Sequence, residues 1–224
     1  TGVVVSPGGM RLMGDIAKEH GLFLISDEVD REFVYGGEPL ATMAQFEDAA
    51  ENVVVVDSIS KRFSACGARV GILLSRNQEL MAQALKICQG RLCAATLDQI
   101  GAAALYGVGS DYFAAVREEY HKRRDTCMEG LAKIHGVVCE CPKGAFYIMA
   151  KLPVDDTDKF QTWLLEEFQD NGETVMFAPG EGFYGTPGKG RDEVRLAYIL
   201  KQADLRRAME VLAHGIEAYN SRKL

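Results

Sequence analysis

Three short apolar runs, separated by helical or polar stretches, constrain the fold of this chain most strongly. The runs are Leu22–Ser26, Asn52–Val56 and Val70–Leu74. Continuous apolar runs of this length are typical of strands that are buried on both faces. The first run follows a predicted helix in which Ser6 is the N-cap and Pro7 occupies the first helical position. Strands that alternate with helices in this way predict an α/β sheet covered by helices.

The second half of the chain has a different pattern. Residues 77–134 are mostly helical, with breaks near residues 90 and 107–109, and the charged amphipathic stretch 112–134 could connect two domains. After it we expect strands at 137–138, 145–152, 174–177 and 193–199, and helices at 159–168 and 203–219. This α+β layout predicts a domain boundary near residue 120, with one domain over 1–120 and a second over 121–224.

Composition narrows the class of protein. The 224 residues carry a formal net charge of -7, with a pI near 5.2. Nucleic acids and anionic membrane surfaces attract clustered Lys and Arg, so we expect neither among the partners, and the apolar runs are too short to span a bilayer. The six cysteines form no Cys-x-x-Cys pair and have no histidine at zinc-site spacing. We therefore expect no metal site, and reduced, mostly buried thiols in a cytoplasmic protein.

The residues with the clearest chemical potential lie just after the second apolar run. Lys61 is accompanied by the hydroxyls of Ser58 and Ser60 and, eight residues later, by Arg69. A lysine forms imines with aldehydes, whereas serine and arginine side chains are good ligands of a phosphate group. Open α/β sheets bind ligands beyond the carboxyl ends of their strands, which is where this stretch is placed. From the residue types alone, a solvated surface loop explains the stretch equally well.

The spacing within this stretch resembles the lysine motif of the class I/II aminotransferases, which are fold type I enzymes dependent on pyridoxal 5'-phosphate (PLP). The resemblance implies that Lys61 is the Schiff-base lysine and that Ser58, Ser60 and Arg69 bind the cofactor. It also implies the C-terminal part of the PLP-dependent transferase large domain, with a mixed, mostly parallel sheet between helices, followed by an α+β small domain. The matching positions are Ser58, Ile59, Ser60, Lys61, Ser64, Ala65, Gly67, Arg69, Val70 and Gly71.

Two further segments resemble the same family in the expected order. The strand-like segment 22–29 ends in Asp27, which by resemblance is a catalytic carboxylate that keeps the cofactor's pyridine nitrogen protonated. The segment 194–198 contains Arg195, which by resemblance binds the α-carboxylate of the substrate. Without the family, Asp27 would be interpreted as a turn-capping residue and Arg195 as an ion-pair or surface residue. The segments 142–147 and 178–184 also resemble the small domain, and we interpret glycine-rich 180–190 as a turn near the substrate rather than a P-loop.

The chain departs from the family in two respects. Three residues after Asp27 the family usually has a tyrosine that donates a hydrogen bond to the cofactor's 3-oxygen, and here the residue is Asp30. An ionised carboxylate cannot donate, so we expect Asp30 to raise the pKa of the Schiff base and to weaken cofactor binding. The resemblance also implies N-terminal truncation, because the family's phosphate-binding loop and the aromatic residue that stacks on the cofactor have no counterpart here.

The resemblance implies an aminotransferase that moves the amino group of an α-amino acid, with aspartate favoured, to a 2-oxo acid such as 2-oxoglutarate. Family members are homodimers, so we expect self-association. Three alternatives remain open: a PLP-dependent β-C–S lyase, the aminotransferase-like effector module of a transcription regulator, and an inactive fragment. A winged-helix pattern upstream of residue 1 would favour the regulator, and a phosphate-binding loop alone would favour the enzyme.

Overall fold

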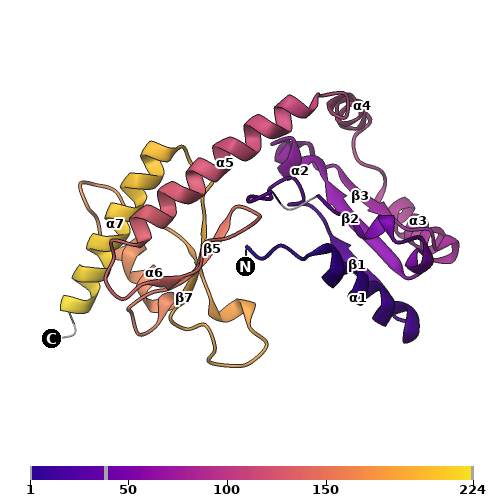
Figure 1. The fold of residues 1–224 in the computed structure, drawn as a ribbon. Helices are drawn as coiled ribbons and strands as arrows, with labels where there is room; N and C mark the ends of the chain where they lie inside the picture. The colour runs from indigo at the N-terminus through magenta and orange to yellow at the C-terminus, as the bar shows by residue number, and fades with distance from the viewer. Residues whose placement is uncertain (1, 38–39, 223–224) are drawn as a thin grey trace. The chain divides into compact units, whose positions relative to one another are not determined.

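A computed structural model describes residues 2–37 and 40–222 (Figure 1). The chain forms two compact units. The N-terminal unit is Val4–Val116, and the C-terminal unit begins at Arg117 and includes Gly2 and Val3. The division falls inside helix α5 (Ser110–Leu131). That these units are the large and small domains of an aminotransferase stays a prediction.

The described part of the N-terminal unit has a three-stranded sheet in the order β1-β2-β3. The strands are β1 (Leu24–Asp27), β2 (Val53–Ser58) and β3 (Gly71–Leu74). β1 pairs with β2 in parallel, with Asp27 opposite Val56, and β2 pairs with β3 antiparallel. The predicted mixed sheet of an α/β fold is therefore confirmed.

Burial differs between these strands more than the apolar runs predict. β2 is buried on both faces near its start, where Val53, Val54 and Val55 are each at most 5% exposed. In β1, however, Ile25 is 68% exposed, and most of β3 is exposed. The prediction of full burial is thus correct for β2 and wrong for β1 and β3, because the described residues do not cover the outer faces of these two strands.

Polar side chains cap the N-termini of several helices in this unit. In α1 (Pro7–Glu19) the Ser6 hydroxyl accepts a hydrogen bond from Gly9 N at 3.1 Å, which confirms the predicted N-cap. Asn77 caps α3 in the same way through Leu80 N. The other helices are α2 (Ile59–Arg62), α3 (Gln78–Arg91), α4 (Thr96–Leu105) and the 3-10 turns Met43–Gln45, Glu47–Ala49 and Cys66–Ala68.

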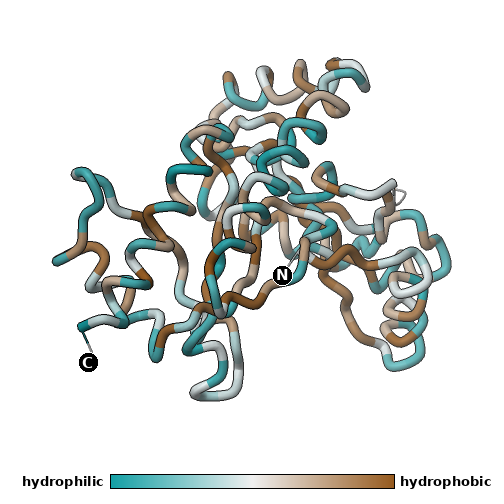
Figure 2. Tube along the Cα trace, turned by 60° about the vertical axis from the view of Figure 1, so that its left-hand side comes forward, coloured by the Kyte–Doolittle hydropathy of each residue, from teal (hydrophilic) through white to brown (hydrophobic). Residues whose placement is uncertain are grey.

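The described C-terminal unit has a four-stranded antiparallel sheet in the order β4-β5-β7-β6. Alternate residues of β5 and β7 are buried, because successive side chains of a strand point to opposite faces of the sheet. Apolar residues of α6 and α7 are buried as well. Hydrophilic and hydrophobic residues are mixed along the helices of the trace, as in helices with one buried face (Figure 2). The elements are β4 (Val138–Cys139), β5 (Tyr147–Lys151), α6 (Thr157–Glu166), β6 (Ala178–Pro179), the 3-10 turn Glu181–Phe183, β7 (Glu193–Ala197) and α7 (Gln202–Ser221).

The cysteines are more exposed than the sequence suggests. Cys127 is buried, and burial raises the pKa of its thiol to about 12. Cys139 is half-buried, and the other four, Cys66, Cys88, Cys93 and Cys141, are exposed. The expectation of mostly buried thiols is therefore wrong, whereas cytoplasmic localisation stays a prediction. Among residues 2–37 and 40–222, no helix is long and apolar enough to cross a membrane.

Asp170 follows α6 in the chain, and its carboxylate contacts two basic residues of α7. The stability that these contacts contribute depends on pH. His214 Nδ1 lies 2.6 Å and Arg207 Nη1 3.2 Å from its carboxylate. The hydrogen bond with His214 is the largest cause that lowers the pKa of Asp170 below its ordinary value of 3.8. A carboxyl group whose pKa is lowered by folding contributes stability above its unfolded pKa and loses it as the pH falls through the folded value.

We therefore expect Asp170→Asn to lower the free energy of unfolding near neutral pH. The difference from the wild type should shrink as the pH falls below 3.8. Urea unfolding of both proteins over a pH series measures this, with Asp204→Asn on the same helix as His214 as the control. A difference that stays constant down to the most acidic condition would contradict the assignment.

Candidate active site

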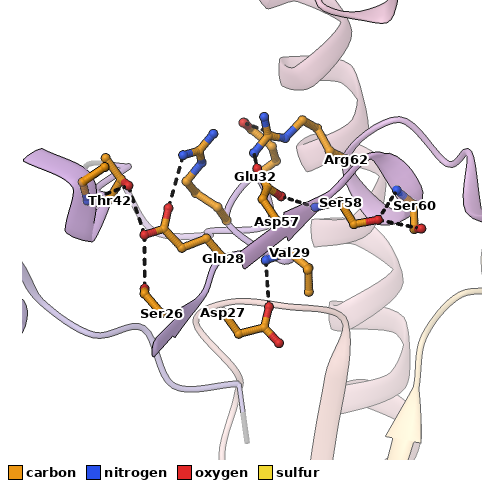
Figure 3. Close-up of polar contacts among 12 residues, drawn as sticks. Ser26, Asp27, Glu28, Val29, Glu32, Thr42, Asp57, Ser58, Ser60 and Arg62 are labelled. Carbon is orange, nitrogen blue, oxygen red and sulfur yellow. Dashed lines mark hydrogen bonds and ion pairs between the residues drawn. The ribbon is translucent and has the colours of Figure 1, made fainter. Parts of the chain in front are cut away.

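The predicted cofactor-binding residues of the N-terminal unit gather at one edge of its sheet. β1 ends at Asp27, and β2 ends at Ser58, immediately before the short helix α2 that carries Lys61. Because β1 and β2 are parallel neighbours, their carboxyl ends lie at the same edge (Figure 3). The structure thus places Asp27 and Lys61 where open α/β sheets bind ligands.

Ser58 and Ser60 form a compact pair of hydroxyls at the start of α2. Ser58 is the N-cap, and its Oγ accepts a hydrogen bond from Ser60 N at 3.0 Å. The same oxygen lies 2.7 Å from Ser60 Oγ (Figure 3). It also lies 3.2 Å from the carbonyl oxygen of Val70. Both side chains are half-buried, so their hydroxyls are held in place and also reachable by a ligand.

Arg69 lies in the connection that leads from the 3-10 turn Cys66–Ala68 to β3. Its backbone has φ +56°, and its side chain donates a hydrogen bond to the Cys66 carbonyl oxygen at 2.9 Å. The guanidinium is exposed, and the Cys66 carbonyl is its one partner among the described residues. Several of its donors therefore remain available to an anion.

Asp27 and Asp30 lie in the turn that follows β1. Asp27 is exposed, and its Oδ1 accepts a hydrogen bond from Val29 N at 3.1 Å. No described residue binds its Oδ2. Asp30 is half-buried, and its carbonyl oxygen accepts from Phe33 N at 2.9 Å. The turn leaves one carboxylate oxygen of Asp27 open at the edge that also carries Lys61.

Sequence reasoning did not identify Glu28, which fixes this turn from inside. Its buried carboxylate accepts hydrogen bonds from Ser26 Oγ at 3.1 Å and Thr42 Oγ1 at 3.0 Å (Figure 3). Met43 N donates a third at 2.9 Å, and Arg31 Nη1 lies 3.3 Å away. These donors hold the carboxylate inside the turn and satisfy its oxygens, as a buried polar group requires. Its partners lie up to fifteen residues away, and nothing in the local sequence pattern distinguishes it.

A second buried network was also missed. Arg62 follows Lys61 directly, and its Nη2 lies 2.6 Å from Asp57 Oδ2, while its Nε lies 3.7 Å from Glu32 Oε1. Asp57 Oδ1 also accepts a hydrogen bond from Ser58 N at 2.7 Å. These contacts join the end of β2, helix α2 and the turn after β1 (Figure 3).

Arg195 belongs to the C-terminal unit, on the face of β7 opposite its buried residues. Its guanidinium lies 4.6 Å from the ring centre of Tyr147 and 4.5 Å from that of Phe183. It makes no hydrogen bond or ion pair with a described residue. The nearby carboxylate of Glu193 instead accepts a hydrogen bond from Tyr184, which raises the pKa of that phenol. A half-buried arginine that two rings orient and no carboxylate neutralises is suited to bind an anion.

Two glycines hold the turn 180–190 against β7. A Cβ on Gly180 would lie 2.7 Å from the Glu193 carbonyl oxygen, and one on Gly190 would lie 2.5 Å from the ring of Tyr184. Gly190 also has φ +75°. The turn therefore packs closely beside the strand that carries Arg195, and Phe183 lies within it.

Several solved structures with the same fold are aminotransferases. An aromatic aminotransferase from Pyrococcus horikoshii OT3 superposes with a TM-score of 0.83 at 27% identity, covering 100% of this chain and 58% of that one. The aspartate aminotransferase from Rhizobium meliloti gives 0.81 at 25% identity, covering 97% of this chain and 55% of that one. An α-aminoadipate aminotransferase from Thermus thermophilus, complexed with N-(5'-phosphopyridoxyl)-L-leucine, has a TM-score of 0.83 at 22% identity, over 96% of this chain and 55% of that one, and supports the fold alone.

Sequence comparison identifies the family. The model of aminotransferase class I and II matches residues 1–212, so the chain belongs to that family, as its lysine motif predicts. The aspartate aminotransferase of Bacillus subtilis is 29% identical over 98% of this chain and 56% of its own length. A probable aspartate/prephenate aminotransferase of Aquifex aeolicus is 30% identical over 97% of this chain and 55% of its own. The chain thus spans about half the length of these relatives.

Proposed function

We propose that this chain is part of a PLP-dependent aminotransferase that moves the amino group of an α-amino acid to a 2-oxo acid. Aspartate is the favoured donor and 2-oxoglutarate the favoured acceptor, because relatives named aspartate aminotransferase are similar over nearly the whole chain. The observation that carries the proposal is the position of Lys61 on α2, at the sheet edge where β1 ends in Asp27.

The residues at this edge fit PLP chemically. Two paired hydroxyls, from Ser58 and Ser60, and the exposed guanidinium of Arg69 match a phosphate ester. The amine of Lys61 matches an aldehyde, and the open carboxylate oxygen of Asp27 matches a protonated ring nitrogen. When bound, PLP supplies an aldehyde that condenses with amines and a ring that accepts electrons.

The chain's own residues then have separate tasks. Lys61 holds the cofactor and, once released, accepts at Nζ the proton that leaves the substrate Cα and returns it later as an acid. Asp27 keeps the proton on the ring nitrogen by its negative charge. Arg195, held between Tyr147 and Phe183, binds and orients the substrate α-carboxylate. We further propose that the complete site lies in a homodimer.

Product analysis separates this function from the alternatives. The chain is incubated with PLP, 2-oxoglutarate and either aspartate or cystathionine. Glutamate formed from aspartate supports an aminotransferase, whereas pyruvate and a thiol formed from cystathionine support a β-C–S lyase. If neither substrate is consumed although borohydride reduction traps PLP on Lys61, the chain binds the cofactor without catalysing the reaction.

Asp30 gives a prediction specific to this chain. We expect Asp30→Tyr to tighten PLP binding about fivefold, because one added hydrogen bond contributes about 1 kcal/mol and a repulsive carboxylate is removed. Absorbance titration with PLP measures the dissociation constant, and Asp30→Phe is the matched control that adds a ring without a donor. Equal constants for the wild type and Asp30→Tyr would show that Asp30 does not face the cofactor.

A further inference from the structure

Arg62 is a buried cation whose position in the chain links it to Lys61. It is the last residue of α2 and only 6% exposed. Its two carboxylate partners come from different places: Asp57 from the end of β2 and Glu32 from the turn after β1. The ion pairs therefore connect the short helix that carries Lys61 to both parallel strands.

Because these ion pairs are buried, they restrict the movement of Arg62 and of α2. The side chains of Arg62, Asp57 and Glu32 are 7%, 8% and 13% exposed, so none can exchange its partner for bulk water without a large opening of the structure. Breaking a buried pair leaves an uncompensated charge, which is far more costly than breaking a surface pair. The shorter contact, 2.6 Å to Asp57, is expected to restrict the guanidinium more than the 3.7 Å contact to Glu32.

Helix α2 depends on such tertiary contacts. A helix of four residues is not stable by itself, because the nucleating turn costs more entropy than its few hydrogen bonds return. On one side Ile59 and Phe63 pack with Ala102 in an apolar cluster. Arg62 supplies the ionic attachment, so between them these contacts fix the backbone on both sides of Lys61.

We propose that Arg62 is a positioning residue for Lys61, a proposal that rests on the function proposed for that lysine. A lysine side chain has four rotatable bonds, and the volume its amine can reach is set by where its backbone is held. By attaching α2 to Asp57 and Glu32, Arg62 keeps the Lys61 amine at the sheet edge that carries Asp27. Arg62 itself does not touch the cofactor or the substrate in this role.

The test uses this chain with two measurements. Hydrogen exchange followed by mass spectrometry reports opening of residues 57–64 without any cofactor. Borohydride trapping with PLP, followed by peptide mapping, reports the rate of adduct formation at Lys61 relative to that at Lys86. The variant is Arg62→Met, and Arg76→Met is the matched control, since Arg76 is an exposed arginine of the same unit with a loose ion pair.

For Arg62→Met we expect amide exchange of residues 57–64 to rise about tenfold or more, while α7 exchanges as in the wild type. The Lys61 trapping rate should fall by a similar factor. Arg62→Lys keeps the charge and should partly restore both the slow exchange of residues 57–64 and the trapping rate at Lys61. Asp57→Asn should raise the exchange of residues 57–64 more than Glu32→Gln. If Arg62→Met unfolds the whole chain, the proposal is tested by the exchange of residues 57–64 in the milder variants. This exchange should be faster in Asp57→Asn than in Glu32→Gln, and faster in Arg62→Lys than in the wild type.

Unchanged exchange of residues 57–64 in Arg62→Met, or an equal change in Arg76→Met, would overturn the proposal. So would a raised exchange that leaves selective Lys61 trapping unaltered. If the wild type shows no trapping at Lys61, the proposed function fails for this chain, while the exchange data still decide whether Arg62 fixes α2. The two failures are thus distinguishable.

Discussion

Replacing Lys61 by alanine is expected to abolish the PLP adduct that borohydride reduction should trap at the sheet edge of the wild-type chain. The reason is chemical: at this position a lysine amine can condense with the cofactor aldehyde, whereas alanine leaves only the noncovalent ligands, the neighbouring hydroxyls and Arg69. Peptide mapping by mass spectrometry after reduction measures the yield of adduct in residues 59–64.

Lys86→Ala is the matched control, because Lys86 lies on α3 of the same unit and its contact, with Gln83 Oε1 at 3.0 Å, is exposed. This variant should keep the wild-type yield at Lys61. A wild-type chain that is labelled evenly over its lysines, or a Lys61→Ala variant that yields as much PLP adduct after borohydride reduction as the wild type, would contradict the assigned role.

Replacing Phe160 by alanine is expected to lower the free energy of unfolding of the C-terminal unit by about 3–5 kcal/mol. Phe160 is fully buried on α6. Its ring centre lies 5.0 Å from that of Tyr219, 5.8 Å from Phe177 and 6.2 Å from Trp163. The loss combines the transfer energy of the ring with a cavity that these neighbours cannot close.

Urea unfolding followed by the fluorescence of Trp163, the chain's single tryptophan, measures this change. Leu165→Ala is the control on the same helix, since Leu165 is 53% exposed and its truncation should cost less than about 1 kcal/mol. Similar losses for the two variants would show that α6 does not pack as described.

Local patterns in the sequence predicted the parts of the fold that local chemistry decides. Ser6 and Pro7 mark the beginning of α1 because capping involves only neighbouring residues. The apolar run that contains Val53 becomes the buried strand β2, and Lys61 lies directly after it. The family resemblance and the α/β fold are confirmed, whereas the roles of the individual site residues stay predictions.

The predictions that failed concern segments whose structure depends on contacts with residues distant in the sequence. Residues 174–177 were expected to form a strand, but Phe177 N donates to Gln161 Oε1 at 2.7 Å and Thr174 Oγ1 to the Leu164 carbonyl oxygen at 2.8 Å. These groups are bound by α6, and pairing with β7 begins only at Ala178. An apolar run cannot show which element will satisfy its backbone.

The same limit applies to the site. The motif identifies Lys61 but gives no weight to Arg62, whose partners lie five and thirty residues away in the chain. Glu28 likewise follows Asp27 without any sign that it will be buried and bonded to Thr42. Sequence spacing therefore predicts which groups can react, whereas the groups that hold them in place emerge only from the fold.

An absorbance titration tests whether Lys61 is the lysine that binds PLP covalently. Wild-type chain and Lys61→Ala are titrated with PLP in parallel, before and after borohydride. We expect a saturable band near the visible edge in the wild type that reduction removes, and no such band in Lys61→Ala. The same saturable band in both proteins would contradict this role of Lys61.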